Sequence, residues 1–231
     1  MCSGSLISPR HILTAGHCVH NYNETERQEH CQKNGDEGFE YPLRNETEFT
    51  VYLGSKCAYP INCQKPYNVE GVISRFPSVC AFDSDVAILE LDDDVPVHEA
   101  TPICLPTRNQ KISGLLMLVG AGYNPTLRDA GIPWLVQLFY IGGDQNDVGF
   151  AVGKNSSACS GDSGGPVFQK GENDRCAAVG LLQSTPTISK EEDPCRHEGL
   201  FQGEWLNLFT DVRRYIGWIC QNTDEIRIRN Y

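Results

Sequence analysis

The sequence lacks the features that direct a chain to a membrane, a nucleic acid or a zinc ion. No apolar run in its 231 residues approaches the roughly 20 residues that cross a bilayer. Lys and Arg number only 19 against 30 Asp and Glu, and a net charge of -11 would be repelled by nucleic acid or by an anionic membrane. No Cys-x-x-Cys pair occurs. We therefore expect no membrane, nucleic-acid or metal partner and no cofactor.

The composition instead indicates a secreted globular protein. A hydrophobic content of 40% is sufficient for one large all-β domain or for two small barrels, each with its own core. Eleven cysteines in a chain of this size are typical of an oxidising compartment. Glycosylation sequons begin at Asn23, Asn45 and Asn155, and they agree with secretion, although no signal peptide begins the chain.

The most informative stretch is Cys159-Ser160-Gly161-Asp162-Ser163-Gly164-Gly165-Pro166. Its glycines allow a tight turn, so that the backbone N–H groups of Gly161 and Ser163 can approach a reacting carbonyl group. This pattern predicts a nucleophilic Ser163 beside an oxyanion hole. A surface turn is the usual meaning of Gly, Ser and Pro together, but the length of the motif disfavours it.

A nucleophilic serine needs a base and a group that orients the base. His17 lies in Leu13-Thr14-Ala15-Gly16-His17-Cys18, and Asp85 directly precedes the apolar run Val86-Ala87-Ile88-Leu89. Asp83 competes with Asp85 for the third role, and we prefer Asp85 because of its position before the apolar run. The predicted triad is therefore His17, Asp85 and Ser163.

With these motifs in the order His, Asp, Ser, the chain resembles the chymotrypsin/trypsin family of serine endopeptidases. The resemblance implies an all-β fold of two six-stranded antiparallel Greek-key barrels with a C-terminal helix. We expect an N-terminal barrel in residues 1–110, carrying His17 and Asp85, and a second barrel in residues 111–231, carrying Ser163. Family members begin about two strands earlier, with a free Ile or Val, so we expect the first barrel to be incomplete and the N-terminus to be truncated.

The resemblance also implies roles for other residues. It pairs Cys2 with Cys18 and places Cys159 and Cys195 in a disulfide, and in several members a cysteine at the position of Cys104 bonds to a pro-segment. Asp162 would pair with the new terminal ammonium group of the processed enzyme and would be an uncompensated buried charge without it. The pairing of seven cysteines stays open: Cys31, Cys57, Cys63, Cys80, Cys104, Cys176 and Cys220.

The family's primary substrate pocket has its base six residues before the nucleophile, which is Ser157 here. A neutral residue there argues against selection of Arg or Lys and predicts an uncharged side chain before the scissile bond. Gln183-Ser184-Thr185 stands where most members have Ser-Trp-Gly, Asn207 stands where a pocket glycine is usual, and Ala121 replaces a tryptophan. Larger side chains at Thr185 and Asn207 would narrow the pocket.

Between these motifs the sequence predicts a hairpin around Ser8-Pro9 and strands that follow the apolar runs, at residues 86–91, 116–122, 135–141, 177–182 and 206–212 and around Phe168. Apolar residues at helical spacing predict a terminal helix over residues 212–219. Residues 21–80 are expected to be decorated loops. Their acidic residues indicate a solvated face, since oxygen ligands at a calcium-binding spacing are not evident.

The sequence therefore favours a secreted serine endopeptidase that acts on polypeptides through an acyl-enzyme, with protein inhibitors or a pro-segment as further partners. The alternative is a secreted protease homologue that keeps the fold for binding but no longer cleaves. The altered Gln183-Ser184-Thr185 segment and the missing start support that alternative, whereas the complete triad opposes it.

Overall fold

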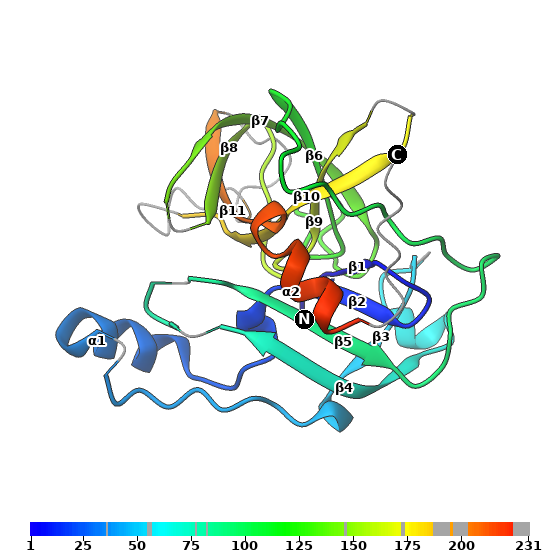
Figure 1. Cartoon of the computed structure of the whole chain (residues 1–231), viewed down its shortest axis with the longest axis horizontal. Helices are drawn as coiled ribbons and strands as arrows, with labels where there is room; N and C mark the ends of the chain where they lie inside the picture. Colours follow the sequence, from blue (N-terminus) through cyan, green and yellow to red (C-terminus); the bar gives the residue numbers. More distant parts are fainter. Residues whose placement is uncertain are drawn as a thin grey trace.

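The computed structural model describes residues 1–35, 37–54, 57–76, 78–81, 83–145, 147–171, 174–186, 195 and 203–223. It contains a five-stranded open sheet, a closed six-stranded barrel and a short helix near the C-terminus (Figure 1). The prediction of a mostly β fold with two successive β units, the first of them incomplete, is confirmed.

The N-terminal sheet is antiparallel, with the strand order β1-β2-β5-β4-β3. The first two strands form the hairpin expected around Ser8-Pro9. Strand β4 lies in the segment for which the sequence predicts loops, and its burial does not alternate cleanly. The strands span β1 Ser5–Leu6, β2 His11–Thr14, β3 Thr50–Val51, β4 Tyr67–Arg75 and β5 Val86–Leu91.

Strand β5 lies at the centre of this sheet and is buried on both faces, because a separate apolar cluster packs on each face. Successive side chains of a strand point to opposite faces, so one strand can contribute to two cores. Ala87, Leu89 and Leu91 join a cluster that includes Tyr67 and Val69. The alternate side chains of Val86 and Ile88 pack instead against Leu13 and the C-terminal helix.

The second unit closes into a barrel with the strand order β10-β11-β8-β7-β6-β9. Its interior shows the alternation of a β-strand: Leu116 and Leu118 of β6 are completely buried, whereas Leu115 is 45% exposed. The strands span β6 Leu115–Gly120, β7 Trp134–Gly143, β8 Val148–Lys154, β9 Pro166–Lys170, β10 Cys176–Ser184 and β11 Glu204–Asp211.

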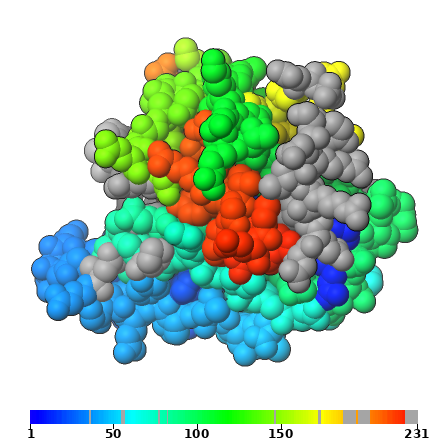
Figure 2. All heavy atoms as spheres, in the orientation of Figure 1, coloured from blue at the N-terminus to red at the C-terminus, as the bar shows by residue number. Residues whose placement is uncertain are grey.

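The C-terminal helix connects the two units. The predicted helix over residues 212–219 is divided in the structure into a 3-10 turn, η5 (Val212–Arg214), and the α-helix α2 (Ile216–Gln221). Its apolar side chains pack with β2 and β5 of the sheet and with Leu181 of β10. In the space-filling view (Figure 2) the helix, in red, lies at the centre of the face, between the barrel above and the sheet below.

The expectation of loops over residues 21–80 was wrong for helix α1 and for strands β3 and β4. Helix α1 (Glu24–Asn34) follows Asn23, whose side chain accepts hydrogen bonds from the backbone N–H groups of Thr25 and Glu26. Asn at this position is a strong helix N-cap. None of the helix residues is buried, so the helix has no apolar stripe that could have revealed it in the sequence.

Short 3-10 turns complete the described secondary structure: η1 Gly16–Cys18, η2 Glu46–Glu48 and η3 Pro60–Asn62. None of the helices in the described ranges is both long and apolar enough to cross a membrane.

Candidate active site

Two neighbouring strands bring His17 and Asp85 to the same end of the sheet. His17 lies in η1, directly after β2, and Asp85 directly precedes β5. These strands pair antiparallel with Thr14 opposite Ala87, so the end of one lies beside the start of the other. Gly16 allows this loop to pack closely against Phe76 and the start of β5, because a Cβ atom there would lie 2.8 Å from the Cβ of Phe76 and 3.1 Å from the backbone nitrogen of Val86.

His17 and Asp85 are joined by two hydrogen bonds. The His17 backbone N–H donates to Asp85 Oδ1 over 2.7 Å, and Nδ1 lies 2.8 Å from Oδ2. Asp85 is fully buried. Burial disfavours the charged imidazolium, but the pKa of His17 is raised above its ordinary value because the charge of Asp85 and its hydrogen bond outweigh burial. With Nδ1 donating to Asp85, Nε2 of the neutral ring carries the lone pair that can accept a proton.

The turn that carries Ser163 has the backbone conformation that its glycines predict. Gly161 has φ +96° and Gly164 has φ +80°, a region that glycine adopts readily. The turn is closed by hydrogen bonds from Asp162 N–H to Cys159 O and from Gly164 N–H to Leu182 O. Among the described residues, the N–H groups of Gly161 and Ser163 donate no hydrogen bond, which is the state required of oxyanion donors.

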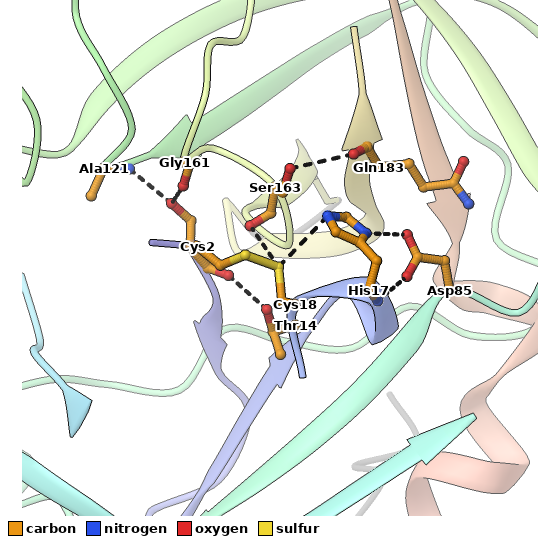
Figure 3. The surroundings of a disulfide bond; sticks show 10 residues. Cys2, Thr14, His17, Cys18, Asp85, Ala121, Gly161, Ser163 and Gln183 are labelled. Carbon is orange, nitrogen blue, oxygen red and sulfur yellow. Dashed lines mark hydrogen bonds and ion pairs between the residues drawn. A yellow bond between two sulfur atoms is a disulfide. The ribbon is translucent and has the colours of Figure 1, made fainter. Parts of the chain in front are cut away.

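The Cys2–Cys18 disulfide lies against both the histidine and the serine (Figure 3). Cys18 Sγ is 3.7 Å from His17 Nε2 and 3.8 Å from the Ser163 backbone oxygen, so these two residues are close together. The Ser163 hydroxyl donates to the Gln183 carbonyl oxygen over 3.4 Å. Transfer of its proton to His17 therefore requires a rotation of the Ser163 side chain, and catalytic hydrogen bonds commonly form only once substrate is bound.

Ser3 ties the N-terminal segment to this turn. Its hydroxyl donates to Gly161 O over 2.9 Å and accepts from the Ala121 N–H over 2.9 Å. Its own backbone N–H donates to Ser163 O over 2.8 Å. The serine turn is thus held from the sheet side as well as from the barrel.

Asp162 is completely buried between these groups, and three N–H donors surround its carboxylate. Oδ1 accepts from Gly122 N over 2.8 Å and from Trp134 Nε1 over 3.2 Å, and Oδ2 accepts from Cys159 N over 2.8 Å. Burial raises its pKa and these donors oppose that rise. The expectation of a carboxylate without compensation is therefore corrected, because hydrogen bonds partly replace a counter-charge.

The predicted substrate pocket is crossed by a network of hydrogen bonds. Asn207 is fully buried, and its Oδ1 accepts from Thr185 Oγ1 over 3.2 Å and from Ala158 N over 3.2 Å. Ser157 is also fully buried, whereas Ser184 is exposed. The two enlarged side chains noted in the sequence thus contact each other. Most of the segment that follows Thr185, residues 187–194 and 196–202, lies outside the described residues.

Gln183 and Thr210 form a connection behind Asp85 that the sequence did not reveal. Gln183 Nε2 donates to Thr210 Oγ1 over 3.0 Å, and Thr210 Oγ1 donates to the Asp85 backbone oxygen over 3.1 Å. All three residues are buried. Gln183 therefore contacts the predicted nucleophile through its carbonyl group and, through its side chain and Thr210, the backbone carbonyl group of Asp85.

Comparison with known proteins identifies the family. A family model described as Trypsin matches residues 1–219. This chain belongs to the trypsin family. It is similar to CLIP domain-containing serine protease B10 of Anopheles gambiae, with 27% identity over 96% of this chain and 61% of that protein.

Other relatives of this trypsin-family chain are similar over the same extent. Melanization protease 1 of Drosophila melanogaster is 24% identical and the proclotting enzyme of Tachypleus tridentatus is 26% identical. Each alignment covers 96% of this chain and 58% of the relative. The chain thus spans about three fifths of the length of these relatives.

The described residues of this trypsin-family chain contain four disulfides. Two of them, Cys2–Cys18 and Cys159–Cys195, join the cysteines that the resemblance had placed in disulfides. Sequence reasoning had left the others open, and they are Cys31–Cys80 and Cys57–Cys63. Cys104, Cys176 and Cys220 carry free thiols. Cys2, Cys18 and His17 also form a cluster of metal-ligand type, but a disulfide supplies no thiolate to a metal.

The insertion that contains α1 lies beside the histidine. Glu24 at the start of α1 contributes to the raised pKa of His17, and burial, Glu24 and Asp85 raise the pKa of Tyr22 to about 12. A cavity of about 610 Å³ opens between the start of α1 and the loop that contains Phe39.

The sequon residues Asn23, Asn45 and Asn155 are all exposed.

Proposed function

We propose that this trypsin-family chain is a secreted serine endopeptidase in which His17, Asp85 and Ser163 hydrolyse peptide bonds. The observation that carries the proposal is the hydrogen-bonded pair of His17 and the buried Asp85, beside a serine whose turn leaves two backbone N–H groups unbonded within the described part of the chain. Such an arrangement combines a base, its orienting carboxylate and an oxyanion hole around one nucleophile.

In the proposed mechanism the Ser163 hydroxyl turns from the Gln183 carbonyl to His17 Nε2, which takes its proton as Oγ bonds to the substrate carbonyl carbon. The resulting oxyanion accepts hydrogen bonds from Gly161 N–H and Ser163 N–H. His17 then gives its proton to the leaving amine, the C–N bond breaks, and an acyl-enzyme remains. Water attacks this ester and passes a proton to His17, which returns the proton to Ser163 Oγ as the ester C–O bond breaks and the acid product departs.

We propose that the enzyme selects a small uncharged side chain before the scissile bond. Ser157 offers no countercharge for Arg or Lys, and burial of an unpaired cation costs several kcal/mol. The Thr185–Asn207 hydrogen bond occupies space that a large side chain would need. These residues, together with Gln183 and Ser184, form the proposed substrate pocket.

One observation favours a second function, a protease homologue that binds polypeptides without cleaving them. The same Thr185–Asn207 contact that restricts the pocket would, if it excludes every side chain, prevent productive binding. The two functions differ in one measurable property, which is covalent reactivity at Ser163.

The proposed setting follows from the surface and the cysteines. Exposed sequons and four disulfides favour secretion, with Asn23, Asn45 and Asn155 glycosylated. Polypeptide substrates would share the cleft with protein inhibitors, and the free, half-buried Cys104 is suited to bond a pro-segment. The sheet ends at Leu91 and the barrel begins at Leu115, which supports a division into residues 1–110 and 111–231.

The experiment is hydrolysis of a peptide library by the folded protein and by its Ser163→Ala variant. We expect cleavage after small uncharged residues by the first protein only, with a loss on the order of 10⁶ in turnover in the variant. A profile dominated by Arg or Lys would overturn the pocket assignment. Equal hydrolysis by both proteins would overturn the proposed nucleophile.

A further inference from the structure

We infer that Trp134 is a positioning residue whose indole N–H holds the buried carboxylate of Asp162, and through it the N–H groups of the oxyanion turn. The inference rests on the proposed function and extends it to a residue outside the sequence motifs. Trp134 Nε1 donates to Asp162 Oδ1 over 3.2 Å. Within the described ranges, it is the only side chain that donates to this carboxylate.

The local sequence explains why the donor comes from a neighbouring strand. Gly120 and Gly122 lie directly against Asp162: a Cβ atom at Gly120 would be 2.1 Å from Oδ1, and one at Gly122 would be 2.5 Å from the Asp162 backbone nitrogen. This segment therefore offers Asp162 the backbone N–H group of Gly122 but no side chain. In the barrel, Gly120 of β6 pairs with Trp134 of β7, so the register delivers the indole to the carboxylate.

Asp162 is rigidly coupled to the two proposed oxyanion donors because it lies between them in the chain. Its N–H bonds to Cys159 O and its carbonyl accepts from Gly165 N–H, so the backbone on both sides is fixed. Gly161 packs so closely that a Cβ atom there would lie 2.9 Å from Gly122 Cα. A displacement of the Asp162 side chain would therefore be transmitted to the N–H groups of Gly161 and Ser163.

Loss of the indole donor leaves a buried carboxylate with two backbone donors in place of three. Since burial already raises the pKa of Asp162, the carboxylate would then take up a proton more readily or move toward water. Both responses weaken the hydrogen bonds by which the Asp162 carboxylate fixes the oxyanion turn. A hydrogen bond to a charged group is worth enough for a change of about 10- to 100-fold in rate.

The test compares Trp134→Phe, which keeps an aromatic ring but removes the N–H, with Trp218→Phe, a matched change at a half-buried tryptophan of α2. We expect Trp134→Phe to lower kcat and the rate of Ser163 labelling by a small alkyl fluorophosphonate about 10- to 100-fold, with little change in KM. We expect Trp218→Phe to react at the rate of the unsubstituted protein. Equal rates in all three proteins would overturn the inference and leave the proposed function standing.

A second readout does not depend on activity. In ¹⁵N-labelled protein, the amide resonances of Gly161 and Ser163 should shift in Trp134→Phe but not in Trp218→Phe, and the Trp134 indole resonance should follow the ionisation of Asp162 with pH. If the folded unsubstituted protein does not react with the fluorophosphonate, but Trp134→Phe still shifts these amide resonances, the proposed function is overturned and the Trp134 contact is supported. An indole resonance that ignores Asp162, with unmoved Gly161 and Ser163 amides, would overturn the inference.

Discussion

The Thr185–Asn207 contact allows a quantitative prediction about specificity. Replacing both residues with glycine removes the two side chains that cross the proposed pocket and leaves Ser157 at its base. A Phe side chain that becomes fully buried on binding gains about 1.5–3 kcal/mol over one left exposed. At about 1.4 kcal/mol per tenfold change, the ratio of kcat/KM for Phe over Ala before the scissile bond should rise by about 10- to 100-fold.

The assay is hydrolysis of matched peptide anilides that differ only in this residue. The double variant also loses buried hydrogen bonds, including those from Asn207 Nδ2 to Trp205 O and from Ala158 N–H to Asn207, so we expect a stability cost of about 1–3 kcal/mol. Thr185→Val is the control, since it keeps the volume and should not shift the ratio. A folded double variant with an unchanged Phe/Ala ratio would refute the location of the pocket.

Two further predictions concern buried charges. Asp85→Asn should lower kcat about 10⁴-fold. It should also shift the acid limb of the pH–rate profile to lower pH, because the Asp85 charge that raises the pKa of His17 is lost while burial remains. An unmoved acid limb would contradict the pairing of His17 with Asp85. Asp162→Asn should be less stable than the unsubstituted protein, because its amide NH₂ opposes a backbone donor. The pKa of Asp162 is raised above its ordinary value of 3.8, so the contribution of this group to stability is full below that pH and is lost as the pH rises through the raised pKa. The difference in unfolding free energy between the unsubstituted protein and Asp162→Asn, measured by urea titration, should therefore narrow from pH 3 upward. A difference that widens with pH would contradict this sign.

The parts of the site that lie in short contiguous motifs could be predicted from sequence. His17, Asp85 and the Ser163 turn each lie beside an apolar run or within a glycine turn, where local chemistry determines local structure. The central strand β5 was equally legible because its residues are buried on both faces.

The remaining features depend on contacts that sequence does not encode locally. The Trp134–Asp162 bond requires the β6–β7 register, and the Gln183–Thr210 bond requires the pairing of β10 with β11. None of the residues of helix α1 is buried, so apolar periodicity gave no signal. The Cys31–Cys80 and Cys57–Cys63 pairs could not be deduced because several cysteines allow many connectivities.

The central claim, that Ser163 is an activated nucleophile, is tested most directly by intact mass spectrometry after treatment with a small alkyl fluorophosphonate. We predict one adduct per folded chain, located on Ser163 by peptide mapping, with none on Ser163→Ala and strongly slowed labelling of His17→Ala. A folded protein that remains unmodified, or that labels equally in Ser163→Ala, would contradict the account.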